Sequence, residues 1–145
     1  MQGVHATSDG PWVPLRLGPE CTAAGAYVWQ CLLQTGAVIA NGTDTPVEDV
    51  DPLASFHASV ARRLPDGTRF TAQQRMNRRQ ALRSYTLDAA YAAFEDTEKG
   101  SLTPGKRADI TILDTDLLTA TEDEIAAARV QATIVGGRIV YRAAD

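Results

Sequence analysis

Apolar side chains recur along the first 96 residues at helical spacing, so the pattern predicts a series of amphipathic helices. A helix over residues 23–34 ends at Gly36. A second, over residues 52–63, has Pro52 at a first-turn position where proline is tolerated. Asn77, with Gln80 three residues later, predicts a capped helix to residue 85. Thr86 could begin a further helix that runs to residue 94.

A short continuous apolar run at residues 37–40 predicts a buried strand between the helices of residues 23–34 and 52–63. Residues 1–4 read as the tail of another strand. The polar segment 5–12 is expected to form a loop, because its Gly-Pro pair disfavours a helix. Strands and helices therefore alternate up to about residue 96, which indicates an α/β fold.

The pattern changes after residue 100. Residues 110–113 alternate as a strand does, and a short helix is expected over residues 122–127. Two further strands, 130–135 and 138–141, are separated by Gly136-Gly137, a strong hairpin signal. Three short strands bury too little surface to form an independent core. They need the preceding helices, or strands from elsewhere, to pack against.

Composition narrows the class of protein. A length of 145 residues fits one ordinary domain, and the net charge of −4 argues against a nucleic-acid or anionic-membrane partner. The sequence contains no apolar run long enough to span a membrane, and its first residues are not expected to form a signal peptide, because they lack a basic start and an apolar core. Cys21 and Cys31 are expected to be reduced, with Cys31 on an apolar helix face. A soluble cytoplasmic protein is the expectation.

Asp44 is the first candidate for chemistry. It follows the apolar run directly, framed by Gly42 and Pro46. In α/β folds, functional side chains gather at the carboxyl ends of strands. An aspartate before Thr-Pro is also common as a turn residue, so spacing alone favours neither interpretation. His5 and Asp9, in a loop at the end of a predicted strand, could bind a ligand or could lie on the surface.

Other polar groups favour ordinary structural roles. His57 lies in a helix between small residues, and Glu48, Asp49 and Asp51 read as a solvated acidic cluster. The sequence contains no phosphate-binding loop, no nucleophile elbow and no H-E-x-x-H zinc motif.

Several stretches together resemble the C-terminal part of a metal-dependent amidohydrolase, in the branch of the N-substituted formamide deformylases, often called the amidohydrolase 3 family. The resemblance covers nearly the whole chain. It rests on His5-Ala-Thr-Ser-Asp-Gly-Pro-Trp12 with Arg16-Leu-Gly18, on Gly42-Thr-Asp-Thr-Pro-Val-Glu48, on Ala81-Leu-Arg-Ser-Tyr-Thr86, and on Gly100-Ser-Leu-x-Pro-Gly-Lys106-x-Ala-Asp109.

The resemblance implies a (β/α)8 TIM barrel with a small β-sandwich. Residues 1–96 would be the C-terminal part of the barrel, with strand seven ending at residue 4 and strand eight at residues 37–40. Residues 97–145 would be the C-terminal strands of the sandwich, whose missing partner strands come from the N-terminal region in this family.

The same resemblance implies a function. It makes Asp44 a metal ligand and proton shuttle in the hydrolysis of a non-peptide carbon–nitrogen bond by metal-activated water. It implies a divalent metal cofactor, expected to be zinc, and a small-molecule amide-type substrate. His5, Asp9 and Trp12 would line the substrate pocket.

The departures from the family pattern shape the hypotheses. The other metal ligands are absent, Thr43 replaces the commoner serine, Gly3 stands where proline is expected, and Asn41 stands where a small or apolar residue is usual. The first hypothesis is a fragment of an amidohydrolase that binds no metal tightly and is inactive alone, lacking its N-terminal barrel part. The alternative is a non-catalytic half-barrel that complements a partner chain or dimerises. An unrelated α/β domain is the third.

Overall fold

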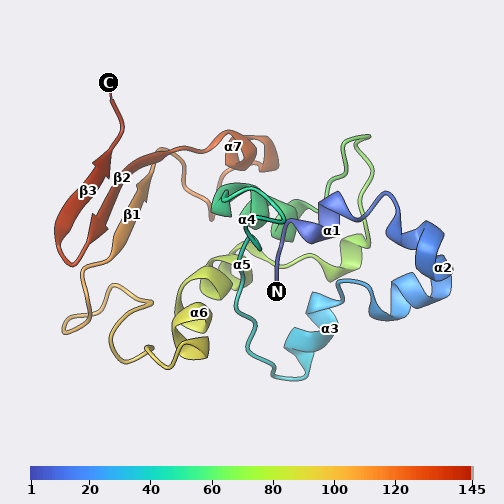
Figure 1. Cartoon of the computed structure of the whole chain (residues 1–145), viewed down its shortest axis with the longest axis horizontal. Coiled ribbons are helices and arrows are strands. Elements are labelled where there is room, and N and C mark those ends of the chain that lie inside the picture. The colour runs from blue at the N-terminus through green and yellow to red at the C-terminus, as the bar shows by residue number, and fades with distance from the viewer. Residues whose placement is uncertain (145) are drawn as a thin grey trace.

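The computed structural model describes residues 1–144. Helices occupy the centre and one end of the molecule, and a small sheet lies at the other end (Figure 1). The elements are α1 (His5–Ser8), α2 (Val13–Gly25), α3 (Trp29–Gln34), α4 (Pro52–Ala61), the 3-10 turn η1 (Ala72–Gln74), α5 (Arg78–Tyr85), α6 (Leu87–Ala92), β1 (Ile110–Leu113), α7 (Glu122–Ala127), β2 (Val130–Val135) and β3 (Arg138–Arg142). The chain therefore has an α/β fold with a small antiparallel sheet.

Helix α4 is the central element, since it packs against α1, α5 and α7. The Asp51 side chain caps its start by accepting hydrogen bonds from the amides of Leu53 and Ala54, at 2.9 and 3.1 Å. The helix ends at Arg62, whose φ of 50° is left-handed, so it stops short of the predicted residue 63. Its buried side chains are Ser55, Phe56, Ala58, Ser59, Val60 and Ala61.

The hydrophobic core joins all the helical segments except α6 to the loops between them. It consists of Ala6, Val13, Ala26, Trp29, Ile39, Phe56, Val60, Phe70, Met76, Ala81, Leu117 and Ile125. Burial of these side chains is the main force that holds the short helices together, because helices of four to thirteen residues are marginal on their own.

The prediction of one helix over residues 23–34 is wrong. Helix α2 ends at Gly25, α3 begins at Trp29, and Tyr27 between them has a left-handed φ of 54°. Two side chains from distant parts of the sequence stabilise the non-helical conformation of Tyr27. Arg62 donates a hydrogen bond to the Tyr27 carbonyl, and the Tyr27 hydroxyl donates one to Asp9. Cys31, expected on an apolar helix face, is exposed.

The predicted buried strand at residues 37–40 is also wrong. The segment is extended but forms no ladder, and Val38 is 49% exposed while Ile39 is buried. Within residues 1–144 its neighbourhood contains a single parallel bridge, from Gln2 to Gly42. An apolar run becomes a buried strand only where other strands and layers cover it, and this segment has little cover. The first residues likewise form only this bridge, and the predicted loop after them contains the short helix α1.

Two further helices follow their local signals. Helix α5 begins with a complete capping box, because the Asn77 side chain accepts from the Gln80 amide and the Gln80 side chain accepts from the Asn77 amide. Helix α6 is shorter than predicted, and the Thr86 hydroxyl bonds the carbonyl of Leu82 instead of capping it. None of the helices within residues 1–144 has the length and apolarity needed to cross a membrane.

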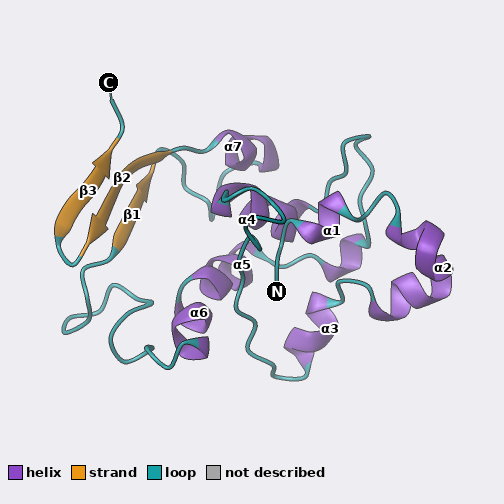
Figure 2. Ribbon diagram, viewed as in Figure 1, coloured by secondary structure: helices purple, strands orange, loops and turns teal. Residues whose placement is uncertain are grey.

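The three predicted strands form one antiparallel sheet in the order β1-β2-β3 (Figure 2). Opposed pairs include Ile110 with Ile134 and Thr133 with Tyr141. Gly136 and Gly137 both have positive φ, as the two-residue hairpin requires. Ala132 is the one buried residue of the sheet, and every residue of β3 is exposed.

Candidate functional site

Two chain segments, around Gln2 and around Gly42, pair in parallel beside the first turn of α4. Gln2 forms a bridge with Gly42, and the Gly42 amide donates a hydrogen bond of 2.9 Å to the carbonyl of Met1. Because the two segments run in the same direction, the residues that follow them, His5 and Asp44, lie at the same end of the pair. Two side chains that are 39 positions apart in the sequence can therefore act together.

Side chains from α4 and from Asn41 reinforce this pairing. Ser55 accepts from the Val4 amide and donates to the Gly42 carbonyl, both at 3.1 Å. Asn41 accepts from the Gly3 amide at 2.9 Å. Because Ser55 contacts both segments, α4 fixes their relative position.

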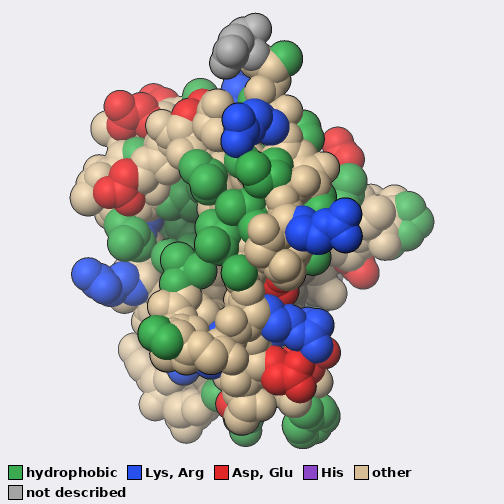
Figure 3. Space-filling model, turned by 90° about the vertical axis from the view of Figure 1, so that its left-hand side faces the viewer, with side chains coloured by type: hydrophobic (Ala, Val, Ile, Leu, Met, Phe, Trp, Pro, Cys, Tyr) green, Lys and Arg blue, Asp and Glu red, His purple; other side chains and the backbone are tan. Residues whose placement is uncertain are grey.

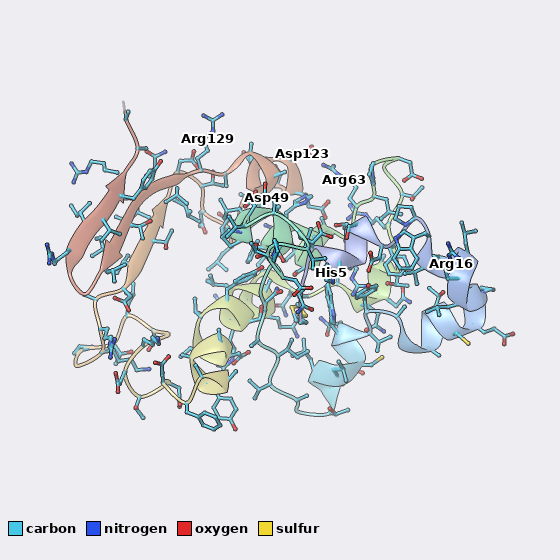
Figure 4. All side chains as sticks on the ribbon, in the orientation of Figure 1. His5, Arg16, Asp49, Arg63, Asp123 and Arg129 are labelled. Atoms are coloured by element: carbon cyan, nitrogen blue, oxygen red, sulfur yellow. The ribbon has the colours of Figure 1, made fainter. Side chains whose placement is uncertain are left out.

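His5 and Asp44 form the candidate site. His5 is the first residue of α1, and its Nε2 lies 3.6 Å from Oδ2 of Asp44. Their side chains are 18% and 43% exposed, so the pair lies at the surface end of the paired segments. His5 Nε2 is itself shielded from solvent and has no hydrogen-bond partner within residues 1–144. Figure 4 shows His5 near the middle of the molecule, at the start of α1. Buried polar atoms usually have a hydrogen-bond partner, so a shielded nitrogen that faces a carboxylate without bonding it marks this pair as a candidate site.

Asp9, predicted beside His5, is directed elsewhere. It follows α1 as its C-terminal cap, and its carboxylate accepts a hydrogen bond from the Tyr27 hydroxyl. Burial, together with this hydrogen bond and the Asp9 charge, raises the pKa of Tyr27. The phenol therefore stays neutral and keeps donating to Asp9, which favours a structural role for this carboxylate.

Arg62 is a fully buried cation next to Tyr27, and the sequence did not point to it. Its guanidinium lies 4.2 Å from the centre of the Trp29 ring and also donates to Thr71. Burial lowers the pKa of Arg62 to about 10. The cation holds the loop of Tyr27 through backbone and aromatic contacts, and it makes no bond to His5 or Asp44 within residues 1–144.

Within residues 1–144, the side chains of the remaining candidates make no hydrogen bond or ion pair with those of His5 or Asp44. Trp12 precedes α2 and is about half exposed. His57 lies on α4, and Asp51 caps that helix. Asp49 is exposed in the loop before α4 (Figure 4). The structure thus brings together two of the predicted site residues, His5 and Asp44, while the Asp9 carboxylate is bonded to Tyr27. That Asp9 and Trp12 line a substrate pocket stays a prediction.

The donor chemistry fits a divalent metal in part. An imidazole nitrogen and a carboxylate oxygen are both common ligands of zinc, and catalytic zinc sites use three protein ligands. Within residues 1–144 no three His, Cys, Asp or Glu side chains gather closely enough to hold a metal ion. The pair therefore fits a metal centre only as part of a larger set of ligands.

A second surface feature does not include this pair. A groove of about 680 Å³ runs between α5, α6 and β1, and its lining is mainly apolar. Viewed from the sheet end, hydrophobic side chains gather around a hollow (Figure 3). The groove is lined by Leu82, Tyr85, Ala89, Ala93, Leu102 and Ile110, among others.

Comparison with known proteins agrees with the sequence motifs. The model of the family described as "Amidohydrolase family" matches residues 1–141. The chain is 37% identical over 142 residues to Protein LONG AFTER FAR-RED 3 from Arabidopsis thaliana, which covers 97% of this chain and 24% of that protein. It is 29% identical over 110 residues to N-substituted formamide deformylase from Arthrobacter pascens, covering 76% of this chain and 20% of that protein.

A solved structure has a similar backbone. An uncharacterized metal-dependent hydrolase from Pyrococcus horikoshii OT3 superposes with a TM-score of 0.71 and is 30% identical, covering 85% of this chain and 25% of that one. The chain spans a fifth to a quarter of the length of the curated relatives described above.

Proposed function

The chain belongs to the amidohydrolase family, and from this premise we propose that it contributes Asp44 to a metal-dependent hydrolase of non-peptide carbon–nitrogen bonds. The observation that carries the proposal is the approach of Asp44 to His5 at the shared end of two paired segments. On this proposal residues 1–96 form the last part of a TIM barrel, and residues 97–145 form strands of a β-sandwich.

A divalent ion, with zinc as the proposed identity, would polarise the scissile carbonyl and make a water molecule more acidic. The chain's own residues would then move the proton. Asp44 Oδ2 would accept the proton of the attacking water and return it to the leaving nitrogen. His5, 3.6 Å away, would hold this carboxylate in place and face the substrate.

The other metal ligands would come from outside the 145 residues, because one imidazole and one carboxylate are fewer than the three protein ligands typical of catalytic zinc. We therefore propose that the isolated chain binds no metal stoichiometrically and does not turn over. The substrate class is a small amide-type molecule. The named activity of the Arthrobacter pascens relative makes N-substituted formamides the first compounds to assay.

A graft tests the proposal. The matched C-terminal part of the Arthrobacter pascens deformylase is replaced by this chain, and deformylation is measured with Asp44, with Asp44→Asn and with Asp49→Asn. We expect the graft to be active and Asp44→Asn to reduce kcat by at least 100-fold, the order of effect that proton transfer contributes. Asp49→Asn, an exposed carboxylate in the same loop, should leave kcat unchanged.

Two results would contradict the proposal. One is a folded, active graft whose activity survives Asp44→Asn. The other is one equivalent of zinc in the isolated chain by elemental analysis, together with turnover, because the chain would then hold a complete site.

The second candidate function is a non-catalytic unit that complements another chain. The apolar groove between α6 and β1 favours it, since exposed apolar surfaces of this kind mark interaction sites. Co-purification with a fixed partner that carries a histidine-rich metal site would support this function. A chain that stays monomeric by light scattering and binds no partner would count against it.

A further inference from the structure

We propose that Asn41 is a positioning residue whose carboxamide sets the register of the two segments that carry His5 and Asp44. The inference deepens the proposed function, on which its catalytic meaning rests. Asn41 itself touches neither His5 nor Asp44; it acts on the backbone that leads to them.

The first observation is the number of bonds that one side chain makes. Asn41 Oδ1 accepts from the Gly3 amide at 2.9 Å and from the Gly42 amide at 3.0 Å. Its Nδ2 donates to Ser59 Oγ at 3.1 Å. One carboxamide therefore ties together both segments and α4. Aspartate could keep the two accepted bonds but not the donated one, and leucine could keep none.

The second observation is that the backbone bonds between these segments end at Gly42. The Met1 amino group donates to the Ala40 carbonyl at 2.5 Å, and the Gly42 amide donates to the Met1 carbonyl at 2.9 Å. Gln2 and Gly42 form the single bridge between them within residues 1–144. Gly3 is buried, so its amide would lose a hydrogen bond inside the protein if Asn41 were removed. In a continued parallel ladder the Gly3 amide would bond a backbone carbonyl of the other segment. Here it bonds the side-chain oxygen of Asn41 instead.

The third observation is the tight contact of Gly3 with α4. A Cβ at this position would lie 2.3 Å from Ser59 Oγ and 2.4 Å from the Ser55 carbonyl. The backbone of the first segment thus rests directly on the helix, with no room for a side chain. A shift of Gly3 along α4 would therefore also move His5, which follows it by two residues.

The consequence concerns the separation of His5 and Asp44. The distance from Nε2 to Oδ2, 3.6 Å, lies just beyond the hydrogen-bond range, and the nitrogen has no other partner within residues 1–144. A shift of a few tenths of an ångström in the register therefore makes or breaks this contact. Asn41 joins both segments directly, as Ser55 does, but Asn41 itself belongs to one of them and so links their backbones without passing through α4.

Nuclear magnetic resonance of the isotope-labelled chain tests the inference without metal or substrate. The readouts are the hydrogen-exchange rate of the Gly3 amide and the imidazole ¹⁵N and ¹H shifts of His5. The variants are Asn41→Leu, Asn41→Asp and Asn77→Ala. Asn77→Ala removes a helix cap whose hydrogen bonds stay within the first turn of α5, and so supplies a matched loss of stability.

In Asn41→Leu we expect the Gly3 amide to exchange about 10-fold faster, the factor that one lost hydrogen bond implies, and the His5 imidazole signals to move. Asn41→Asp keeps the acceptor, so it should restore most of the Gly3 protection and the His5 shifts. Asn77→Ala should leave both readouts at their wild-type values once its exchange is corrected for global stability.

Unchanged His5 signals in a folded Asn41→Leu chain would overturn the inference, as would equal His5 shifts in Asn77→Ala. If Asn41→Leu fails to fold by circular dichroism, Ser59→Ala decides. It removes the acceptor of the Asn41 Nδ2 bond and, with it, the hydrogen bond within α4 that the Ser59 hydroxyl donates to the Ser55 carbonyl at 2.8 Å. His5 signals that stay fixed in Ser59→Ala would then overturn the inference. Neither readout depends on turnover, so failure of the enzymatic proposal remains distinguishable.

Discussion

Replacement of Ile125 by alanine should detach the C-terminal sheet from the helical part of the molecule. Ile125 is fully buried in the core, on α7, and α7 packs against α4. The change removes three carbon atoms, which corresponds to about 2.4 kcal/mol of lost burial. The cavity left behind raises the loss in the free energy of unfolding into the range of about 2–5 kcal/mol.

Ion pairs beside Ile125 should not compensate for this loss. Arg69 pairs with Glu122 at 2.9 Å and Arg63 pairs with Asp123 at 2.5 Å, the latter labelled in Figure 4. These side chains are partly or largely exposed, and exposed pairs contribute about 0–1 kcal/mol each. The apolar contact of Ile125 therefore dominates the attachment of α7.

Urea denaturation followed by circular dichroism measures the loss, and hydrogen exchange of the β2 amides shows whether the sheet loosens first. The matched control is Ile139→Ala on β3, where the same side chain is 54% exposed. It should cost about 1 kcal/mol, half of the burial term. A cost for Ile125→Ala that does not exceed that of the control would refute the reasoning.

Three further changes test local features. Asp51→Ala removes the cap of α4 and should lower stability by about 1 kcal/mol in urea denaturation. Gly100→Ala, at φ 88° and with its Cβ 2.8 Å from that of Ala90, should cost at least about 2 kcal/mol, more than Gly105→Ala at φ 93° in open space. Burial, reinforced by the Arg63 charge, lowers the pKa of His57 below 6.5, so the unfolded chain takes up a proton more readily and stability should fall as the pH drops below 6.5. His57→Gln should reduce the fall in melting temperature between pH 8 and pH 5.5, measured by thermal melts. An unchanged dependence of the melting temperature on pH would count against this reasoning.

Elements governed by neighbours in sequence could be predicted. The capping box of Asn77 and Gln80 starts α5, and the Gly136-Gly137 turn joins β2 to β3. Both signals act within a few residues, where side-chain hydrogen bonds and allowed φ values decide the conformation. The strands and the short helix after residue 109 were predicted correctly for this reason.

Elements governed by contacts between residues far apart in the sequence could not be predicted. The apolar stripe over residues 23–34 continues through Tyr27, but Arg62 and Asp9 hold that residue in a non-helical conformation from 35 and 18 positions away. Burial of the run at residues 37–40 depends on covering layers that local sequence does not reveal.

The candidate site was predicted residue by residue but not as a contact. His5 and Asp44 were each identified from their place after an apolar segment, while their approach follows from the parallel bridge between Gln2 and Gly42. Asn41 stood out only as a polar residue at the end of an apolar run. Its three hydrogen bonds emerge from the fold.

The exposed edge of β3 has a consequence for self-recognition. If two copies paired antiparallel through this edge in register, Arg138 of one strand would oppose Arg142 of the other at both ends. Like charges directly opposite each other destabilise a strand pair. The two arginines therefore disfavour pairing of β3 with a second copy of itself and favour a strand that has carboxylates at its ends. In this register, they oppose the growth of filaments through the open edge of the sheet.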